Sequence, residues 1–210
     1  MNTLSEQFIN FTISNQILKF GEFKTKAGRI SPYFFNMGLI NNGKDLKELG
    51  KFYQEHINKN NITFDLLFGP AYKGISIVSA TAIAFGDANI KFAFNRKEVK
   101  DHGEGGQIIG HPIQGDVVII DDVISAGTAV RESINIIKAH GGNPKAIIVA
   151  IDRQEKGQGH ESAIQEVKND FNIDVFPIIN LDDVVDFITK NEELNQYLEK
   201  IEDYRSVYGA

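Results

Sequence analysis

Short runs of apolar residues that alternate with helical patterns constrain the fold of this chain more than any other feature. The runs lie at residues 64–68, 91–94, 116–120, 146–151 and 175–179. Patterns typical of helices occur between or after them, at residues 74–85, 129–140 and 161–168. Because a strand that is apolar along its whole length is buried on both faces, this alternation predicts an α/β fold with a central, mostly parallel sheet flanked by helices. Ligands in such folds bind beyond the carboxyl ends of the strands.

The segments around these runs complete the expected layout. Apolar residues at near-helical spacing predict a helix over residues 3–20, which Gly21 would end. Residues 22–38 are expected to form two short extended pieces around a turn, and residues 45–58 and 181–204 are expected to be mostly helical. The connection at residues 96–115 is rich in glycine and longer than most structureless loops, which predicts a mobile lid over a functional site.

Composition limits the classes of function. The chain has 210 residues, 42% of them apolar, which is enough for one sizeable core and predicts a single domain. Its net charge of -6 argues against nucleic-acid or membrane-surface binding, because such surfaces require clustered Lys and Arg. The absence of cysteine excludes disulfides and thiolate catalysis, and the sequence contains neither a signal-peptide pattern nor a membrane-span pattern. We therefore expect a soluble, cytoplasmic protein with no nucleic-acid and no membrane partner.

The run at residues 116–120 leads directly into two adjacent carboxylates, Asp121 and Asp122, and then into the small residues 125–128. A helix follows, so free backbone N–H groups gather at its N-terminus beside hydroxyl groups, an arrangement suited to a phosphate. The two acids would repel that phosphate, so we expect them to face sugar hydroxyls or Mg2+. A ribose 5-phosphate fits both parts of this site, because its phosphate suits the helix start and its hydroxyls suit the two acids. The alternative is a strand that merely ends in two acids and a helix that Thr128 caps, without a ligand.

The segment VVIIDDVISAGTA, residues 117–129, resembles the phosphoribosyl pyrophosphate (PRPP) signature of the type I phosphoribosyltransferases. The segments KAGRISPYFFN (26–36), FGPAYKGI (68–75) and FNRKEVKDHGEGG (94–106) resemble the orotate-specific members of that family at corresponding places. The likeness covers nearly the whole chain. It implies the type I phosphoribosyltransferase fold as a single domain over residues 1–210, with a small N-terminal hood at about 1–40, a core at about 41–210 and a mobile active-site loop.

The resemblance assigns a set of residues to PRPP. Without it, the cations of residues 96–102 would suit a solvated loop of mixed charge, because Glu98, Asp101 and Glu104 lie among them, and Lys73 would be an ordinary surface lysine. With it, we expect Lys100, His102, Asp121 and Asp122 to be catalytic. The residues expected to bind PRPP are Lys26, Tyr72, Lys73, Arg96, Lys97, Lys100, His102, Asp121, Asp122, Val123, Ile124, Ser125, Ala126, Gly127, Thr128 and Ala129.

The resemblance also assigns the base. Phe34 and Phe35 alone are more typical of a hydrophobic core, but the corresponding pair in the family lines the orotate pocket. Arg153 follows the run at residues 146–151, and a guanidinium binds a planar carboxylate such as that of orotate through two parallel hydrogen bonds. Ser125 stands where the family signature often has threonine, so the hydroxyl is kept. We expect Phe34, Phe35, Ser125 and Arg153 to bind orotate.

The implied reaction is the transfer of the 5-phosphoribosyl group from PRPP to orotate, which gives orotidine 5'-phosphate and diphosphate in pyrimidine biosynthesis. Mg2+ is the expected cofactor, held through PRPP with Asp121 and Asp122 nearby and without a direct protein ligand. The family forms homodimers in which the loop with Lys97, Lys100 and His102 reaches the neighbouring subunit's site. The alternatives are a phosphoribosyltransferase for another purine or pyrimidine base, and a PRPP-sensing regulator, which the acidic composition disfavours.

Overall fold

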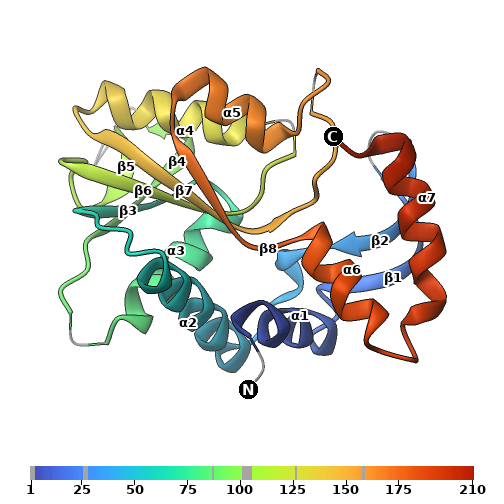
Figure 1. The fold of residues 1–210 in the computed structure, drawn as a ribbon. Helices are drawn as coiled ribbons and strands as arrows, with labels where there is room; N and C mark the ends of the chain where they lie inside the picture. Colours follow the sequence, from blue (N-terminus) through green and yellow to red (C-terminus); the bar gives the residue numbers. More distant parts are fainter. Residues whose placement is uncertain (1–2, 26–27, 87, 101–105, 126, 158) are drawn as a thin grey trace.

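The computed structural model describes residues 3–25, 28–86, 88–100, 106–125, 127–157 and 159–210. Within them lies a six-stranded sheet with the order β5-β4-β3-β6-β7-β8, in which the antiparallel β4–β5 pair lies at one edge and the other neighbours are parallel (Figure 1). The strands are β3 (Leu66–Gly69), β4 (Phe92–Lys100), β5 (Gly106–Gly110), β6 (Asp116–Val123), β7 (Asn143–Asp152) and β8 (Asp174–Asn180). The predicted α/β fold with a mostly parallel sheet is confirmed.

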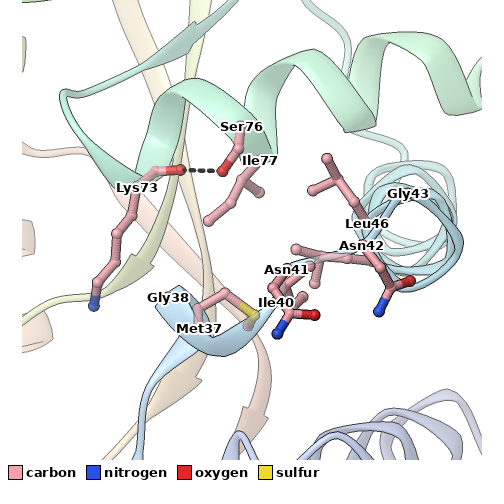
Figure 2. Close-up of a pocket in the computed structure, with 11 residues that line it drawn as sticks. Met37, Gly38, Ile40, Asn41, Asn42, Gly43, Leu46, Lys73, Ser76 and Ile77 are labelled. Atoms are coloured by element: carbon pink, nitrogen blue, oxygen red, sulfur yellow. Dashed lines mark hydrogen bonds between the residues drawn. The ribbon is translucent and has the colours of Figure 1, made fainter.

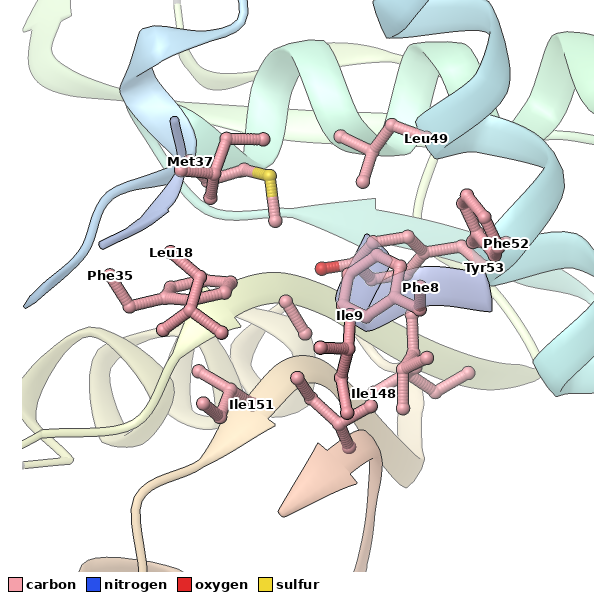
Figure 3. Close-up of a cluster of buried hydrophobic side chains, with 14 of the residues drawn as sticks. Phe8, Ile9, Leu18, Phe35, Met37, Leu49, Phe52, Tyr53, Ile148 and Ile151 are labelled. Carbon is pink, nitrogen blue, oxygen red and sulfur yellow. The ribbon is translucent and has the colours of Figure 1, made fainter. Parts of the chain in front are cut away.

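Alternating side chains of β6 show how the sheet is buried on both faces. Val117 and Ile119 belong to a core cluster with residues of α4 (Thr128–Ala139) and α5 (Ala163–Phe171). Val118 and Ile120 belong to a second cluster, which Figure 3 shows in part. The helices that supply this second cluster are α1 (Leu4–Ser14), α2 (Gly43–Lys59), α3 (Lys73–Ala84), α6 (Leu181–Thr189) and α7 (Leu198–Tyr208). Packing on both faces holds the carboxyl end of β6 in a fixed position.

A separate antiparallel hairpin, β1 (Leu18–Lys24) and β2 (Ile30–Phe35), lies beside the main sheet and carries α7 on its flank (Figure 1). Tyr33 of β2 packs edge-on against Tyr204 of α7, with ring centroids 6.3 Å apart. Two short 3-10 turns, Met37–Leu39 and Asn195–Tyr197, complete the described elements. No helix among the described residues is long and apolar enough to cross a membrane.

Three predicted elements differ in the structure. The helix expected over residues 3–20 ends at Ser14, because Gln16 adopts a left-handed φ of 58° and Leu18 pairs with Phe35 in the hairpin. The segment at 96–115 is not structureless, because β4 continues to Lys100 and pairs with β5. The first two differences have one cause: pairing with another strand overrides the local pattern. The helix expected over 181–204 is also divided, into α6 and α7.

Candidate active site

The acid pair lies inside β6 rather than beyond it, because this strand continues to Val123. Asp121 and Asp122 are each 7% exposed. The Tyr53 hydroxyl donates a hydrogen bond to the carbonyl oxygen of Asp121 at 2.8 Å, and the Asp122 backbone N–H donates to Oδ1 of Asp121 at 2.9 Å. Backbone pairing with β7 and the Tyr53 bond hold this part of the strand, and the bond from the Asp122 N–H orients the Asp121 carboxylate.

Two buried carboxyl groups side by side perturb one another. Burial, with a further contribution from the adjacent Asp122 carboxylate, raises the pKa of Asp121 to about 7, while the nearby Lys73 ammonium acts in the opposite direction. Such a pair favours a cation or hydroxyl donors as partners over any anion. This is the chemistry that the sugar part of a phosphorylated ribose offers.

Lys73 begins α3, directly after the turn that follows β3. Its Nζ atom lies 2.5 Å from Oδ2 of Asp122. The turn is compact, because a Cβ atom added at Gly69 would lie 2.2 Å from the backbone oxygen of Gly74. The Asn95 side chain of β4 accepts a hydrogen bond from the Ala71 N–H at 3.0 Å. The turn therefore holds Lys73 against the acid pair.

Of the predicted cations on β4, Lys97 lies near this turn and Arg96 contacts β5. The Lys97 ammonium lies 5.6 Å from the ring centroid of Tyr72, a side chain that is 72% exposed. Arg96 donates from Nη1 to the Gly106 carbonyl oxygen at 3.4 Å. The backbone of Lys100 ends β4. Lys26, His102 and Ala126 lie outside the described residues.

The start of α4 has features that suit an anion. Gly127 is the residue before α4 and has a left-handed φ of 73°, a conformation that glycine adopts most easily. No side chain caps the helix, so its first backbone N–H groups have no side-chain partner from the cap position. The alternative in which Thr128 caps the helix is wrong, because Thr128 and Ala129 are themselves in its first turn.

A cavity of about 620 Å3 lies between this edge of the sheet and the hairpin. It brings together predicted residues for both substrates, and the predicted residues that line it are Phe34, Phe35, Lys73, Asp122, Val123, Ile124, Ser125 and Arg153. Asp121, Tyr72, Arg96, Lys97, Gly127, Thr128 and Ala129 are not among its lining residues. The two phenylalanines differ: Phe34 is 39% exposed, whereas Phe35 is 8% exposed and also belongs to the core.

Arg153 enters the cavity from the segment after β7, and three contacts with two neighbours hold it. Its Nη2 atom lies 2.6 Å from Oε1 of Glu155, and its Nε–H donates to the Tyr33 hydroxyl at 3.2 Å. Its guanidinium carbon lies 4.9 Å from the centroid of the Tyr33 ring. Burial acts to lower the pKa of Arg153, but Tyr33 and Glu155 outweigh it and keep this pKa above its ordinary value. The guanidinium is therefore charged and fixed.

Sequence reasoning missed Tyr33, Glu155 and Arg29, which also line this cavity. Glu155 lies two residues after Arg153, so a charged pair at a strand end was a usable signal. Tyr33 lies 120 positions away from Arg153, and only the hairpin brings the two together. A second cavity of about 480 Å3 lies on the other side of Lys73, between α3 and the start of α2 (Figure 2).

The described residues contain no cluster of three or more His, Asp or Glu side chains that could hold a metal ion. Asp121 and Asp122 together offer a metal ion only two carboxylates. Mg2+ accepts few protein ligands when a substrate phosphate supplies the other oxygens. The donor set therefore fits an ion that is carried mainly by a phosphorylated ligand.

The family model of the phosphoribosyl transferase domain matches residues 39–178. This match covers more than half of the chain, which therefore belongs to the phosphoribosyltransferases. The chain is 53% identical to the orotate phosphoribosyltransferase of Marinobacter nauticus and 49% identical to that of Thiobacillus denitrificans, over the whole of each pair of chains. The crystal structure of the Francisella tularensis orotate phosphoribosyltransferase matches with a TM-score of 0.85 at 40% identity, covering 97% of this chain and 100% of the other. Within that class, the chain belongs to the orotate phosphoribosyltransferases.

Proposed function

We propose that the chain transfers the 5-phosphoribosyl group from PRPP to orotate, giving orotidine 5'-phosphate and diphosphate in the biosynthesis of pyrimidine nucleotides. One observation carries this function beyond family membership. A single cavity is lined by a buried carboxylate, Asp122, by Ser125 of the anion loop, and by a fixed guanidinium, Arg153. These groups match the ribose hydroxyls, the 5-phosphate and the orotate carboxylate respectively.

The proposed arrangement places PRPP along the carboxyl edge of the sheet. Its 5-phosphate would accept hydrogen bonds from backbone N–H groups at the start of α4 and from Ser125, where the helix dipole favours negative charge. Its ribose hydroxyls would donate to Asp121 and Asp122. Its diphosphate would lie toward the turn with Tyr72 and Lys73. Orotate would then lie between Phe34 and Arg153.

The chemistry needs little beyond positioning and charge. As the bond from the anomeric carbon to diphosphate lengthens, positive charge develops on the ribose and negative charge on the leaving group. Asp121 and Asp122 would stabilise the positive charge on the ribose. Lys73 and the cations of β4 would stabilise the negative charge on the leaving diphosphate. Bound Mg2+ would add positive charge beside the diphosphate oxygens. The residues of this chain would hold the orotate nitrogen in line with the anomeric carbon and exclude water.

We also propose that this chain has the remaining features of the family. The chain would act as a single phosphoribosyltransferase domain in the cytoplasm, with the hairpin region at residues 1–40 as a hood. It would form a homodimer in which Lys97, Lys100 and His102 reach the neighbouring subunit's site. The hairpin of β4 and β5 supports a lid, because the two strands pair up to Lys100 and Gly106, beyond Phe94, which is the last partner of β3.

Base selectivity tests the proposed function. The purified chain is supplied with PRPP, Mg2+ and, in separate reactions, orotate, uracil, adenine or hypoxanthine. We expect only orotate to be consumed, because Arg153 needs a carboxylate that the other bases lack. Consumption of a purine or of uracil at a comparable rate would assign the chain to another base. Binding of PRPP without transfer to any base would instead support the sensor.

A further inference from the structure

We infer that Glu155 is a positioning residue for orotate: its carboxylate holds the guanidinium of Arg153 and ties it to Arg29 of the hairpin. The inference rests on the proposed function and deepens it. It concerns how the specificity of the base site is built, through a side chain that is not expected to touch the substrate.

The geometry around Glu155 supports this role. Its Oε1 atom lies 2.6 Å from Nη2 of Arg153 and accepts a hydrogen bond from the Tyr33 hydroxyl at 3.0 Å. The same hydroxyl accepts from Nε of Arg153, and Nη2 lies 3.5 Å from Oγ of Ser31. The described contacts of Arg153 thus engage Nε and Nη2. They leave Nη1 for a substrate carboxylate in the cavity that Arg153 lines.

Glu155 also contacts Arg29 of the hairpin. Its Oε2 atom lies 3.8 Å from Nη1 of Arg29, and the Arg29 guanidinium carbon lies 4.7 Å from the ring centroid of Tyr208 in α7. The backbone beside Glu155 is held by the end of α7, because Lys156 N–H donates to the Tyr208 carbonyl oxygen at 2.9 Å. One carboxylate therefore joins the core segment after β7, the hairpin and the C-terminal helix.

This arrangement has a physical consequence for specificity. A free arginine side chain has several rotamers, and fixing one of them upon binding costs entropy. Glu155 and Tyr33 impose that rotamer before orotate arrives. Side-chain exposures of 23% for Arg153 and 17% for Glu155 place the pair where an unpartnered charge is costly. Without Glu155, the Arg153 guanidinium should therefore leave the position that binds orotate rather than become more available to the substrate.

Steady-state kinetics of three variants test the inference. Glu155→Ala should raise the KM for orotate about tenfold or more, since hydrogen bonds to charged groups are the strong ones. Glu155→Gln retains an acceptor of the same shape and should lie between Glu155→Ala and the unaltered enzyme. Tyr33→Phe keeps the ring and loses the hydroxyl, and should raise the KM for orotate about threefold or more. The KM for PRPP and kcat should change by less than about twofold in each. Glu192→Ala, at an exposed carboxylate, is the matched control and should change neither constant.

A double-mutant cycle tests the link to the hairpin. Arg29→Ala should raise the KM for orotate in the unaltered enzyme and have a smaller effect when Glu155 is already alanine, because the two side chains act through one contact. Equal effects in both backgrounds would overturn this link.

The outcomes separate the inference from the proposed function. If the unaltered enzyme does not consume orotate, the proposed function fails. If it does consume orotate, an unchanged KM for orotate in Glu155→Ala would overturn the inference. A lower KM would mean that Glu155 competes with the substrate for Arg153 and would overturn it as well. A fall in kcat together with equal rises in the KM values for orotate and PRPP would assign Glu155 a general structural role and would also overturn the inference. Should Glu155→Ala lose its cooperative thermal transition, Tyr33→Phe decides by the same criteria.

Discussion

The Nζ atom of Lys73 lies 2.5 Å from Oδ2 of Asp122, so the turn assigned to the diphosphate and the strand assigned to the ribose meet through an ion pair. The two residues are 49 positions apart in the sequence. The pair partly neutralises the buried acids in the absence of a ligand. If PRPP binds as proposed, Lys73 would exchange Asp122 for the diphosphate, which would couple the ribose and diphosphate parts of the sugar site.

Lys73→Met should expose that coupling. We expect the KM for PRPP to rise about tenfold or more, because a charged hydrogen bond to the diphosphate is lost, while the KM for orotate changes little. The Lys73 ammonium also lowers the pKa of Asp121, so its removal should move the acidic limb of the pH profile of kcat/KM to higher pH. A profile that keeps its position would contradict the electrostatic coupling.

Asp121→Asn should make the protein more stable at alkaline pH and inactive in transfer. The pKa of Asp121 is raised on folding, so the protonated form stabilises the native state at low pH. That contribution is lost as pH rises from about 4 through about 7, where the carboxylate ionises. Asparagine stays neutral, so the Tm difference between variant and unaltered enzyme should increase over this window and then level off. Thermal unfolding at several pH values measures it, and a constant difference would argue against the raised pKa.

The double variant with Asp121→Asn and Asp122→Asn separates chemistry from folding. Transfer should be abolished, while a cooperative thermal transition remains because backbone pairing of β6 with β3 and β7 is unaffected. If the transition is lost, the acids have a structural role instead.

Gly127→Ala tests the anion loop. An alanine at φ 73° is strained by about 1–2 kcal/mol, and its Cβ would lie 3.3 Å from Cγ2 of Val167. We expect lower stability and a higher KM for PRPP. Gly141→Ala is the matched control: Gly141 has φ 84° at the other end of α4, with no atom within 4 Å of an added Cβ. It should show comparable backbone strain without a change in the KM for PRPP.

Much of the fold and part of the site were predictable because their signals are local. The continuous apolar runs predicted the buried parallel strands, and the small residues after Asp122 predicted the start of a helix, which is α4. The chain order of these segments then places their carboxyl ends at one edge of the sheet.

Contacts between distant segments were not predictable. The helical spacing of residues 3–20 failed at Leu18 because its partner Phe35 is in another strand. The Arg153 site depends on Tyr33 in the same way. Individual residue types show that a tyrosine or a glutamate can bind a guanidinium, but only the folded hairpin determines which ones do.

Lys100 remains a prediction that rests on the family resemblance. Lys100→Ala should lower kcat far more than it weakens orotate binding, since a lid cation acts on the departing diphosphate. Equal losses in both would argue against a lid role. Mixing this variant with one carrying Asp122→Asn should restore part of the activity after subunit exchange, because some sites would combine an intact lid with an intact acid pair. No recovery would contradict shared sites.

The most direct test of the central claim is a measurement of orotate and diphosphate in the same reaction. With the purified chain, PRPP and Mg2+, orotate should disappear and diphosphate should appear in equal amounts, and omission of PRPP or Mg2+ should stop both. Diphosphate release without orotate consumption, or no reaction with the complete mixture, would contradict orotate phosphoribosyl transfer.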